Sequence, residues 1–155
     1  MSKKRFTAAD VFAGAGGMSI GAIAAGLDLK WVVNHSPLAF DIHQMNNPNV
    51  RHERSNIFDV DATWFSDMPD VDVFLAAPAC QAYSSASTRG ATGNRGRSGS
   101  GEMLRATAFS VLTAIDGMSR RRKKPKLVIV ENVRGFQRWS FDPDNPDGSQ
   151  YQWWL

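Results

Sequence analysis

The sequence predicts an α/β domain in which a mostly parallel sheet carries helices on both faces. An apolar stretch at 7–12 leads through a glycine-rich turn into a helix-compatible segment at 18–27. Two short apolar runs lie at 71–76 and 126–130, the first followed by A-P-A-C and the second by E-N-V, and an amphipathic segment at 102–118 lies between them. Strands that alternate with helices in this way are typical of βαβ units, which form parallel sheets.

The remaining elements follow from local signals. Trp31–Val33 predicts a second strand, and Ser36-Pro37 predicts the start of a helix through about Met45, because proline favours the first helical turn. A third short strand is expected to end around 55–57, before a helical turn near 61–65. The helix at 18–27 places four apolar residues on one face, namely Ile20, Ile23, Ala24 and Leu27.

Composition limits the class of protein. The 155 residues carry a net charge of +3 and suffice for one domain with its own core. A single cysteine excludes an internal disulfide framework, and the three scattered histidines show no zinc-ligand spacing, so no metal is expected. No apolar run is long enough to span a bilayer and the basic start lacks an apolar signal region, which makes a cytoplasmic protein without a membrane partner the expectation.

Basic residues cluster in two places. The block at 120–126 follows a predicted helix, where cations are favoured, and we interpret it as a solvated helix end. The stretch at 84–101 is rich in glycine and serine and has too little apolar surface to order itself, which predicts a mobile loop over a site. Arginines in or beside this loop favour contact with a polyanion such as nucleic acid: Arg89, Arg95, Arg97 and Arg105.

Two reactive side chains follow predicted strands. Cys80 comes just after the strand at 71–76, and Glu131 follows the strand at 126–130 directly. Open α/β sheets place their chemistry at the carboxyl ends of the strands, so the two residues would share a crevice. A buried structural thiol and a surface or helix-capping carboxylate explain the local sequences equally well.

The glycine-rich turn lets the backbone approach a ligand at a helix N-terminus. It is not the dinucleotide fingerprint, because Ser19 stands where the third glycine would be, and no Lys-Ser/Thr pair follows to make a P-loop. Asn34 ends the second strand, where such folds usually hold a ribose through a carboxylate.

Four pieces in fixed order resemble the N-terminal part of the cytosine-C5 DNA methyltransferase family: 12–17 (F-A-G-A-G-G), 34–37 (N-H-S-P), 78–81 (P-A-C-Q) and 131–133 (E-N-V). The first is similar to the family's cofactor motif, the third to its Pro-Cys-Gln nucleophile motif, and the fourth matches its Glu-Asn-Val motif. The resemblance covers 6 to about 139. It implies a Rossmann-like domain that binds S-adenosyl-L-methionine (AdoMet) and methylates DNA, as in restriction-modification systems.

By this resemblance Cys80 is the nucleophile that adds to C6 of a cytosine flipped out of the duplex, and Glu131 holds the N3 and N4 edge of the base. Asn132 braces the ends of the strands. The residues expected at the substrate are Gln81, Ser84, Asn132, Arg95 and Arg97. The residues implied at the cofactor are Phe12, Gly14, Gly16, Gly17, Asn34, Asn56, Ile57 and Pro78.

The chain departs from the family pattern in three ways. Ala79 stands where a proline normally precedes the cysteine, and Asn34 and Asn56 replace acidic residues. The family's later arginine-bearing, target-recognition and final motifs are missing, so we expect a split or truncated enzyme with a second chain as partner. We expect a catalytic part at 1–140 and an aromatic-ended tail at 141–155. A non-catalytic module, another modification at C5, and an RNA substrate remain alternatives.

Overall fold

The computed structural model describes residues 5–80, 99–121, 123–140 and 147–155, with the backbone alone at 99–105. The chain forms two units. The first comprises Met1–Ala77 and Ser110–Glu131, and the second comprises Pro78–Phe109 and Asn132–Leu155. Each unit is therefore made of two separate segments of the sequence. The sequence analysis expects one boundary, after residue 140, and this boundary stays a prediction.

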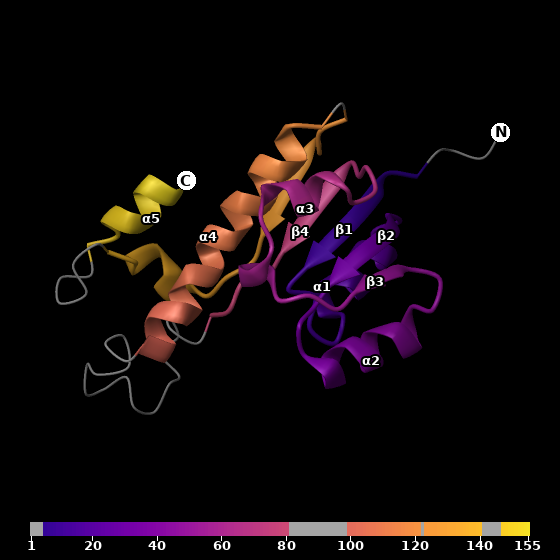
Figure 1. The fold of residues 1–155 in the computed structure, drawn as a ribbon, viewed down its shortest axis with the longest axis horizontal. Helices are drawn as coiled ribbons and strands as arrows, with labels where there is room; N and C mark the ends of the chain where they lie inside the picture. The colour runs from indigo at the N-terminus through magenta and orange to yellow at the C-terminus, as the bar shows by residue number, and fades with distance from the viewer. Residues whose placement is uncertain (1–4, 81–98, 122, 141–146) are drawn as a thin grey trace. The chain divides into compact units, whose positions relative to one another are not determined.

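The first unit is built on a parallel sheet with the strand order β3-β2-β1-β4-β5 (Figure 1). This confirms the predicted fold class. Chain order reverses between β1 and β4, which creates the switch point where α/β sheets open a crevice. The strands are β1 (Thr7–Val11), β2 (Asp28–Val33), β3 (Arg51–Glu53), β4 (Val73–Ala76) and β5 (Leu127–Val130).

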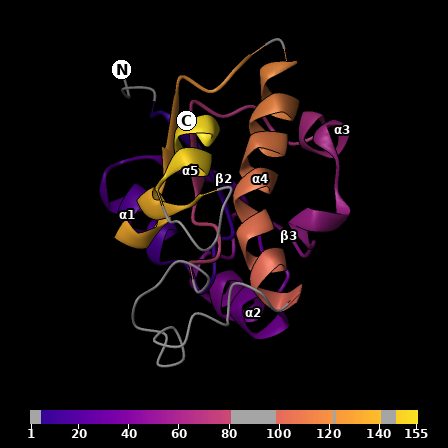
Figure 2. The same ribbon diagram turned by 90° about the vertical axis from the view of Figure 1, so that its left-hand side faces the viewer.

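Helices connect these strands, and right-handed crossovers put α1 and α2 on one face of the sheet and α3 and the carboxyl half of α4 on the other. α1 and the carboxyl half of α4, on opposite faces of the sheet, can be followed in Figure 2. A 3₁₀ turn, η1, precedes α3. The bounds are α1 (Gly17–Ala24), α2 (Pro37–Asn46), η1 (Ile57–Asp59), α3 (Ala62–Ser66) and α4 (Gly99–Ser119).

Two sequence predictions for the first unit were wrong in detail. The third strand ends at Glu53 rather than at 55–57, because a polar edge strand is defined by its backbone pairing with β2 and not by an apolar run. The expected apolar face of α1 is also turned outward, with Ile20 and Ile23 exposed. The buried positions of α1 are Ser19 and Ala22.

Large aromatic side chains fill the core of the first unit. Trp31 is fully buried on β2, its ring lies 6.2 Å from that of Phe74, and its indole N–H donates to the Pro69 carbonyl at 3.0 Å. At the amino end of the sheet, Asp72 accepts from the backbone N–H and the hydroxyl of Thr7, both at 3.0 Å. These bonds hold the pKa of Asp72 below its usual range and tie the starts of β1 and β4 together.

The basic block at 120–126 largely finds acidic partners within the same unit. Arg120 pairs with Asp116 and Arg121 with Asp70, at 2.6 Å and 2.7 Å. Lys123 and Lys126 lie 3.5 Å and 3.2 Å from Asp72. This agrees with a helix end that neutralises its own surroundings rather than a dedicated phosphate site.

Gly117 lets α4 pack directly on α3. A Cβ atom at this position would lie 2.2 Å from the Ala62 carbonyl oxygen and 2.8 Å from Cβ of Phe65. Gly117→Ala is therefore expected to lower the free energy of unfolding by about 1–3 kcal/mol, despite alanine's better helix propensity. Urea denaturation measures this, and Gly21→Ala on α1, where nothing lies within 4 Å, is the control that should not destabilise the chain. Equal midpoints for both variants would contradict the packing.

The second unit has its own small aromatic core. Phe136 in the 3₁₀ turn η3 (Arg134–Arg138) and Trp139 pack with Ala108. The C-terminal helix α5 (Ser149–Trp154) adds Trp154, whose indole N–H donates to the Ala108 carbonyl at 2.9 Å. The aromatic end of the chain is thus partly structural, while Trp153 stays 62% exposed.

Candidate active site

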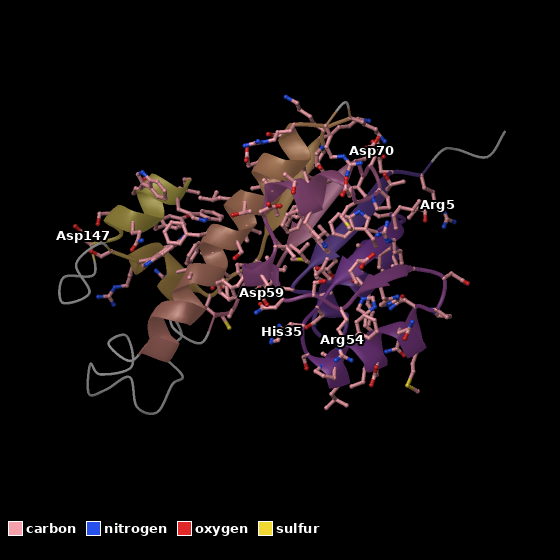
Figure 3. All side chains as sticks on the ribbon, in the orientation of Figure 1. Arg5, His35, Arg54, Asp59, Asp70 and Asp147 are labelled. Atoms are coloured by element: carbon pink, nitrogen blue, oxygen red, sulfur yellow. The ribbon has the colours of Figure 1, made fainter. Side chains whose placement is uncertain are left out.

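A pocket of about 450 Å³ opens in the first unit at the carboxyl ends of the central strands. This edge is polar. Figure 3 shows His35, Arg54 and Asp59 at this end of the sheet, with Arg5 and Asp70 at the opposite end. The lining comes from the end of β1, the glycine-rich turn, the start of α1, the end of β4 and the residue after β5: Asp10, Phe12, Ala13, Gly14, Ala15, Gly17, Met18, Ala77 and Glu131.

The glycine-rich turn between β1 and α1 has the backbone geometry that its sequence requires. Gly14 and Gly16 have φ values of +54° and +105°, and Phe12 adopts φ +59°, which is rare for a residue with a side chain. Gly16 is buried against α2, since a Cβ there would lie 3.0 Å from Cδ2 of His43. The turn leaves the N-terminus of α1 at the pocket.

Asp10 is a pocket residue that the sequence analysis missed. It lies inside β1 with no exposed surface, and its Oδ1 has no hydrogen-bond partner among the described residues. Burial raises its pKa from 3.8 to about 6. The sequence did contain a signal for this residue. Asp10 is a charged residue within a buried apolar strand, just before a glycine-rich turn, and such a position indicates a functional role.

A hydrogen-bonded row extends from Asp10 through α1 and α2 to β3. Ser19 Oγ lies 2.6 Å from Asp10 Oδ2 and 3.0 Å from His43 Nε2. His43 Nδ1 lies 2.8 Å from His52 Nε2, and His52 Nδ1 lies 2.7 Å from the Val50 carbonyl. Burial, and secondly the nearby His52, lowers the pKa of His43. We call Asp10, Ser19, His43 and His52 the polar relay.

The buried carboxyl of Asp10 should make the ligand-free chain less stable as the pH rises. Because its folded pKa is about 6 and its unfolded value 3.8, its contribution is complete below pH 4 and is lost as the pH rises through 6. Asp10→Asn should therefore gain about 2–3 kcal/mol over the wild type between pH 4 and pH 7. Denaturant titrations at several pH values measure this difference, and a constant difference would contradict it.

Cys80 lies in the second unit, four residues after the last residue of β4, and its side chain is partly exposed. Pro78, two residues earlier, is buried. The side-chain N–H of Asn132 lies 3.5 Å from the Pro78 carbonyl, so the segment before the cysteine is joined to the segment after β5. Asn132 also accepts from the N–H of Val133 at 2.8 Å. The role expected of Asn132 stays a prediction.

Glu131 belongs to the first unit and lines the pocket with an exposed side chain. Its backbone N–H donates to the Ala76 carbonyl at 2.9 Å, which fixes it beside the end of β4. The parallel pairing of Ala76 with Val130 brings these two strand ends level. The sheet thus places the carboxylate beside the strand that leads to Cys80.

The other residues expected at the cofactor occupy varied positions. Phe12, Gly14 and Gly17 line the pocket. Asn34 is buried at the end of β2, and its Oδ1 accepts from the N–H of Ser36 at 3.0 Å. Asn56 is exposed and caps η1 by accepting from Phe58 N at 3.3 Å, while Ile57 is buried. Asn34, Asn56, Ile57, Gly16 and Pro78 are not part of the pocket lining.

Several predicted substrate residues lie outside the described residues, namely Gln81, Ser84, Arg95 and Arg97. Most of the expected mobile loop at 84–101 also lies outside them. Its last three residues, 99–101, were predicted wrongly, because they form the first turn of α4.

Within the described part of the chain, no helix has the length and apolar character needed to cross a membrane. The same residues contain no group of three or more His, Cys, Asp or Glu side chains that could hold a metal ion.

Comparison with known proteins identifies relatives among methyltransferases. The type II methyltransferases M.XorII of Xanthomonas oryzae pv. oryzae and M.AquIA of Picosynechococcus sp. are each 28% identical to this chain, over 131 and 136 residues. The alignments cover 81% and 84% of the chain but 28% and 49% of those proteins. The chain thus spans about half or less of their length.

Solved structures show the same fold. A Dnmt2 methyltransferase of S. pombe matches 96% of this chain and 39% of its own with a TM-score of 0.63 at 17% identity. A putative DNA modification methyltransferase from an E. coli prophage matches 94% of this chain and 37% of its own, with a TM-score of 0.62 at 21% identity. The family model for C-5 cytosine-specific DNA methylase matches residues 6–141, and the chain belongs to this family.

Proposed function

We propose that this chain is the cofactor-binding and nucleophile-bearing part of an enzyme that transfers a methyl group from AdoMet to C5 of cytosine in DNA. One observation carries the proposal. The glycine-rich pocket opens at the strand ends that bear Glu131 and that lead to Cys80, the single cysteine of the chain. Membership of the C-5 cytosine-specific DNA methylase family supports the same chemistry.

The pocket suits AdoMet, which carries an ammonium, a sulfonium and a carboxylate group. Asp10 offers a buried acceptor without a partner among the described residues, which fits a cationic group. The N-terminus of α1 offers backbone N–H groups to a carboxylate. The positive φ of Gly14 and Gly16 lets the backbone approach the ligand closely. When bound, AdoMet supplies an electrophilic methyl group.

The residues of the chain would activate the base. The thiolate of Cys80 adds to C6 of the cytosine, forming the S–C6 bond and moving the electron pair of the C5–C6 double bond to C5. One carboxyl oxygen of Glu131 accepts from the N4 amino group, and the other, protonated, donates to N3 and stabilises the negative charge that builds there. Once C5 is methylated, loss of its proton restores the double bond and expels Cys80. Asn132 keeps the two strand ends together.

DNA is the proposed substrate, and the cytosine must leave the duplex to reach both side chains, at a cost of a few kcal/mol of stacking. Arg95 and Arg97 follow Cys80 by 15 and 17 residues in the sequence, and we propose that they neutralise phosphates. An RNA substrate, or transfer of a different group to C5, would use the same two side chains. Base analysis of the product distinguishes these outcomes.

A second polypeptide is proposed as partner on the ground of the exposed edge of the sheet at β5. We propose that it docks beside β5, an edge strand whose free side has no paired strand among the described residues. Leu127 and Ile129 on β5 are 51% and 42% exposed, which is unusual for the strand next to β4 in a parallel sheet. An added strand would bury both.

The test is a methyl-transfer assay with labelled AdoMet and cytosine-containing duplex DNA. The chain is assayed alone and after co-expression with the product of the adjacent reading frame. The proposal expects 5-methylcytosine in the second case. If the chain binds AdoMet but transfers no methyl group, either alone or with the co-expressed product, the result would instead favour a non-catalytic module. Absence of AdoMet binding would contradict the proposed cofactor.

A further inference from the structure

The polar relay connects Asp10 in the pocket to β3 through Ser19, His43 and His52, three side chains to which the proposed function assigns no role. Asp10 and Ser19 have no exposed surface and His43 is 1% exposed, so no solvent separates these three groups. The relay ends at His52, whose Nδ1 faces the Val50 carbonyl. Because a carbonyl can only accept, His52 Nδ1 must carry a hydrogen.

Counting hydrogens along the relay gives two consistent states. In the first state Ser19 donates to an ionised Asp10, so His43 Nε2 must donate to Ser19 Oγ. A second hydrogen lies between His43 Nδ1 and His52 Nε2, and a third is on His52 Nδ1. The two imidazoles then hold three hydrogens and one positive charge. If Asp10 is protonated and donates to Ser19, Ser19 donates to His43 Nε2, and both imidazoles are neutral. The two states contain the same number of protons.

We propose that His43 and His52 exchange one proton with Asp10 through the Ser19 hydroxyl, and so set the charge that Asp10 presents to the pocket. When a cationic group of the ligand approaches Oδ1 of Asp10, the proton leaves Oδ2 for the Ser19 oxygen, and the Ser19 hydrogen passes to His43 Nε2. The carboxylate becomes anionic and the imidazole pair cationic, with no proton lost to solvent. His43 and His52 are positioning residues for the cofactor site, and the ligand part of this inference rests on the proposed function.

The environment of the relay favours such sharing. Burial raises the pKa of Asp10 to about 6 and lowers that of His43, which brings the carboxyl and the imidazole closer in proton affinity. Few other charges face the relay. Glu131 lines the same pocket, α1 has no charged residue, and Arg51 and Glu53 beside His52 pair with each other at 2.6 Å.

The first test needs no ligand. Nitrogen NMR of the imidazoles follows the three histidines with pH in the wild type and in Asp10→Asn, with the exposed His35 as internal reference. Loss of the Asp10 carboxylate should lower the apparent pKa of His43 and leave the His35 signals as they are in the wild type. Asp28→Asn, which removes an exposed carboxylate paired with Lys30, is the control. A pair that titrates identically in wild type and Asp10→Asn would overturn the proposal.

The second test uses AdoMet and calorimetry near pH 6 in buffers of different ionisation enthalpy. Wild type should bind with almost no proton release. His43→Gln, whose amide can still donate to Ser19, should release roughly half a proton per AdoMet at pH 6 and more at lower pH, because the pKa of Asp10 is about 6. The affinity of His43→Gln for AdoMet should fall up to about tenfold per pH unit below pH 6, because Asp10 becomes protonated there. Proton release by both proteins would refute the exchange. Absence of AdoMet binding together with a normal NMR result would refute the proposed cofactor and leave the exchange intact.

Discussion

Replacing Cys80 by alanine is expected to abolish methyl transfer by the complete enzyme while leaving AdoMet affinity within about twofold of wild type. The reaction needs a nucleophile at C6, and the chain has no second thiol to supply one. Cys80 is not among the residues that line the pocket, so its removal should not disturb cofactor binding. Single-turnover transfer of labelled methyl groups and calorimetric AdoMet titration measure the two properties.

Cys80→Ser is the matched control for packing at this position. Serine nearly preserves the size of the side chain but is a far weaker nucleophile, so it should lose transfer as completely as alanine does. Full activity in either variant would show that the chain attacks the base with another group. Loss of both transfer and AdoMet binding would assign Cys80 a structural role instead.

Replacing Glu131 by glutamine is expected to lower kcat on the order of 10²–10³-fold, the usual effect of removing one group that stabilises developing charge. Glutamine keeps the size of the side chain but presents a neutral amide to the N3 and N4 edge. The backbone hydrogen bond from Glu131 to Ala76 does not involve the side chain and should persist. AdoMet affinity should change less than about tenfold, because the proposed contact of Glu131 is with the base. Pre-steady-state kinetics separates these effects.

Glu53→Gln on β3 is the control for loss of a carboxylate in the same unit, and it should leave kcat unchanged because Glu53 pairs with Arg51 outside the pocket. Equal kcat values for Glu131→Gln and wild type would remove Glu131 from the proposed chemistry. If Glu131→Gln weakens AdoMet binding but leaves kcat unchanged, Glu131 would be a cofactor-binding residue instead.

The central strands could be predicted from the sequence because their apolar runs are local signals. The starts of α2 and α3 were equally readable, from Pro37 in the first turn and from Asp61, whose side chain accepts from the N–H groups of Thr63 and Trp64. The edge strand β3 was misplaced because Arg51–Glu53 has no hydrophobic pattern. The exposed face of α1 was missed because spacing shows which residues share a face, but not which face the sheet covers.

The candidate site was predictable only where its residues form contiguous motifs. Phe12, Gly14 and Gly17 were found in this way and line the pocket. The polar relay could not be found, since its members come from four elements and no local pattern links Asp10 to His52. The same holds for Asn34 and Asn56, whose local capping bonds depend on the backbone geometry of the loops.

Covalent trapping on DNA tests the central claim most directly. The complete enzyme is incubated with AdoMet and duplex DNA that contains 5-fluorocytosine, in which fluorine replaces the hydrogen that must leave C5. If Cys80 attacks C6, the adduct cannot resolve, and peptide mass spectrometry will find the modified base on Cys80 in the wild type and no adduct in Cys80→Ala. An adduct on another residue, or 5-methylcytosine formation from ordinary DNA without any trapped adduct, would contradict the account.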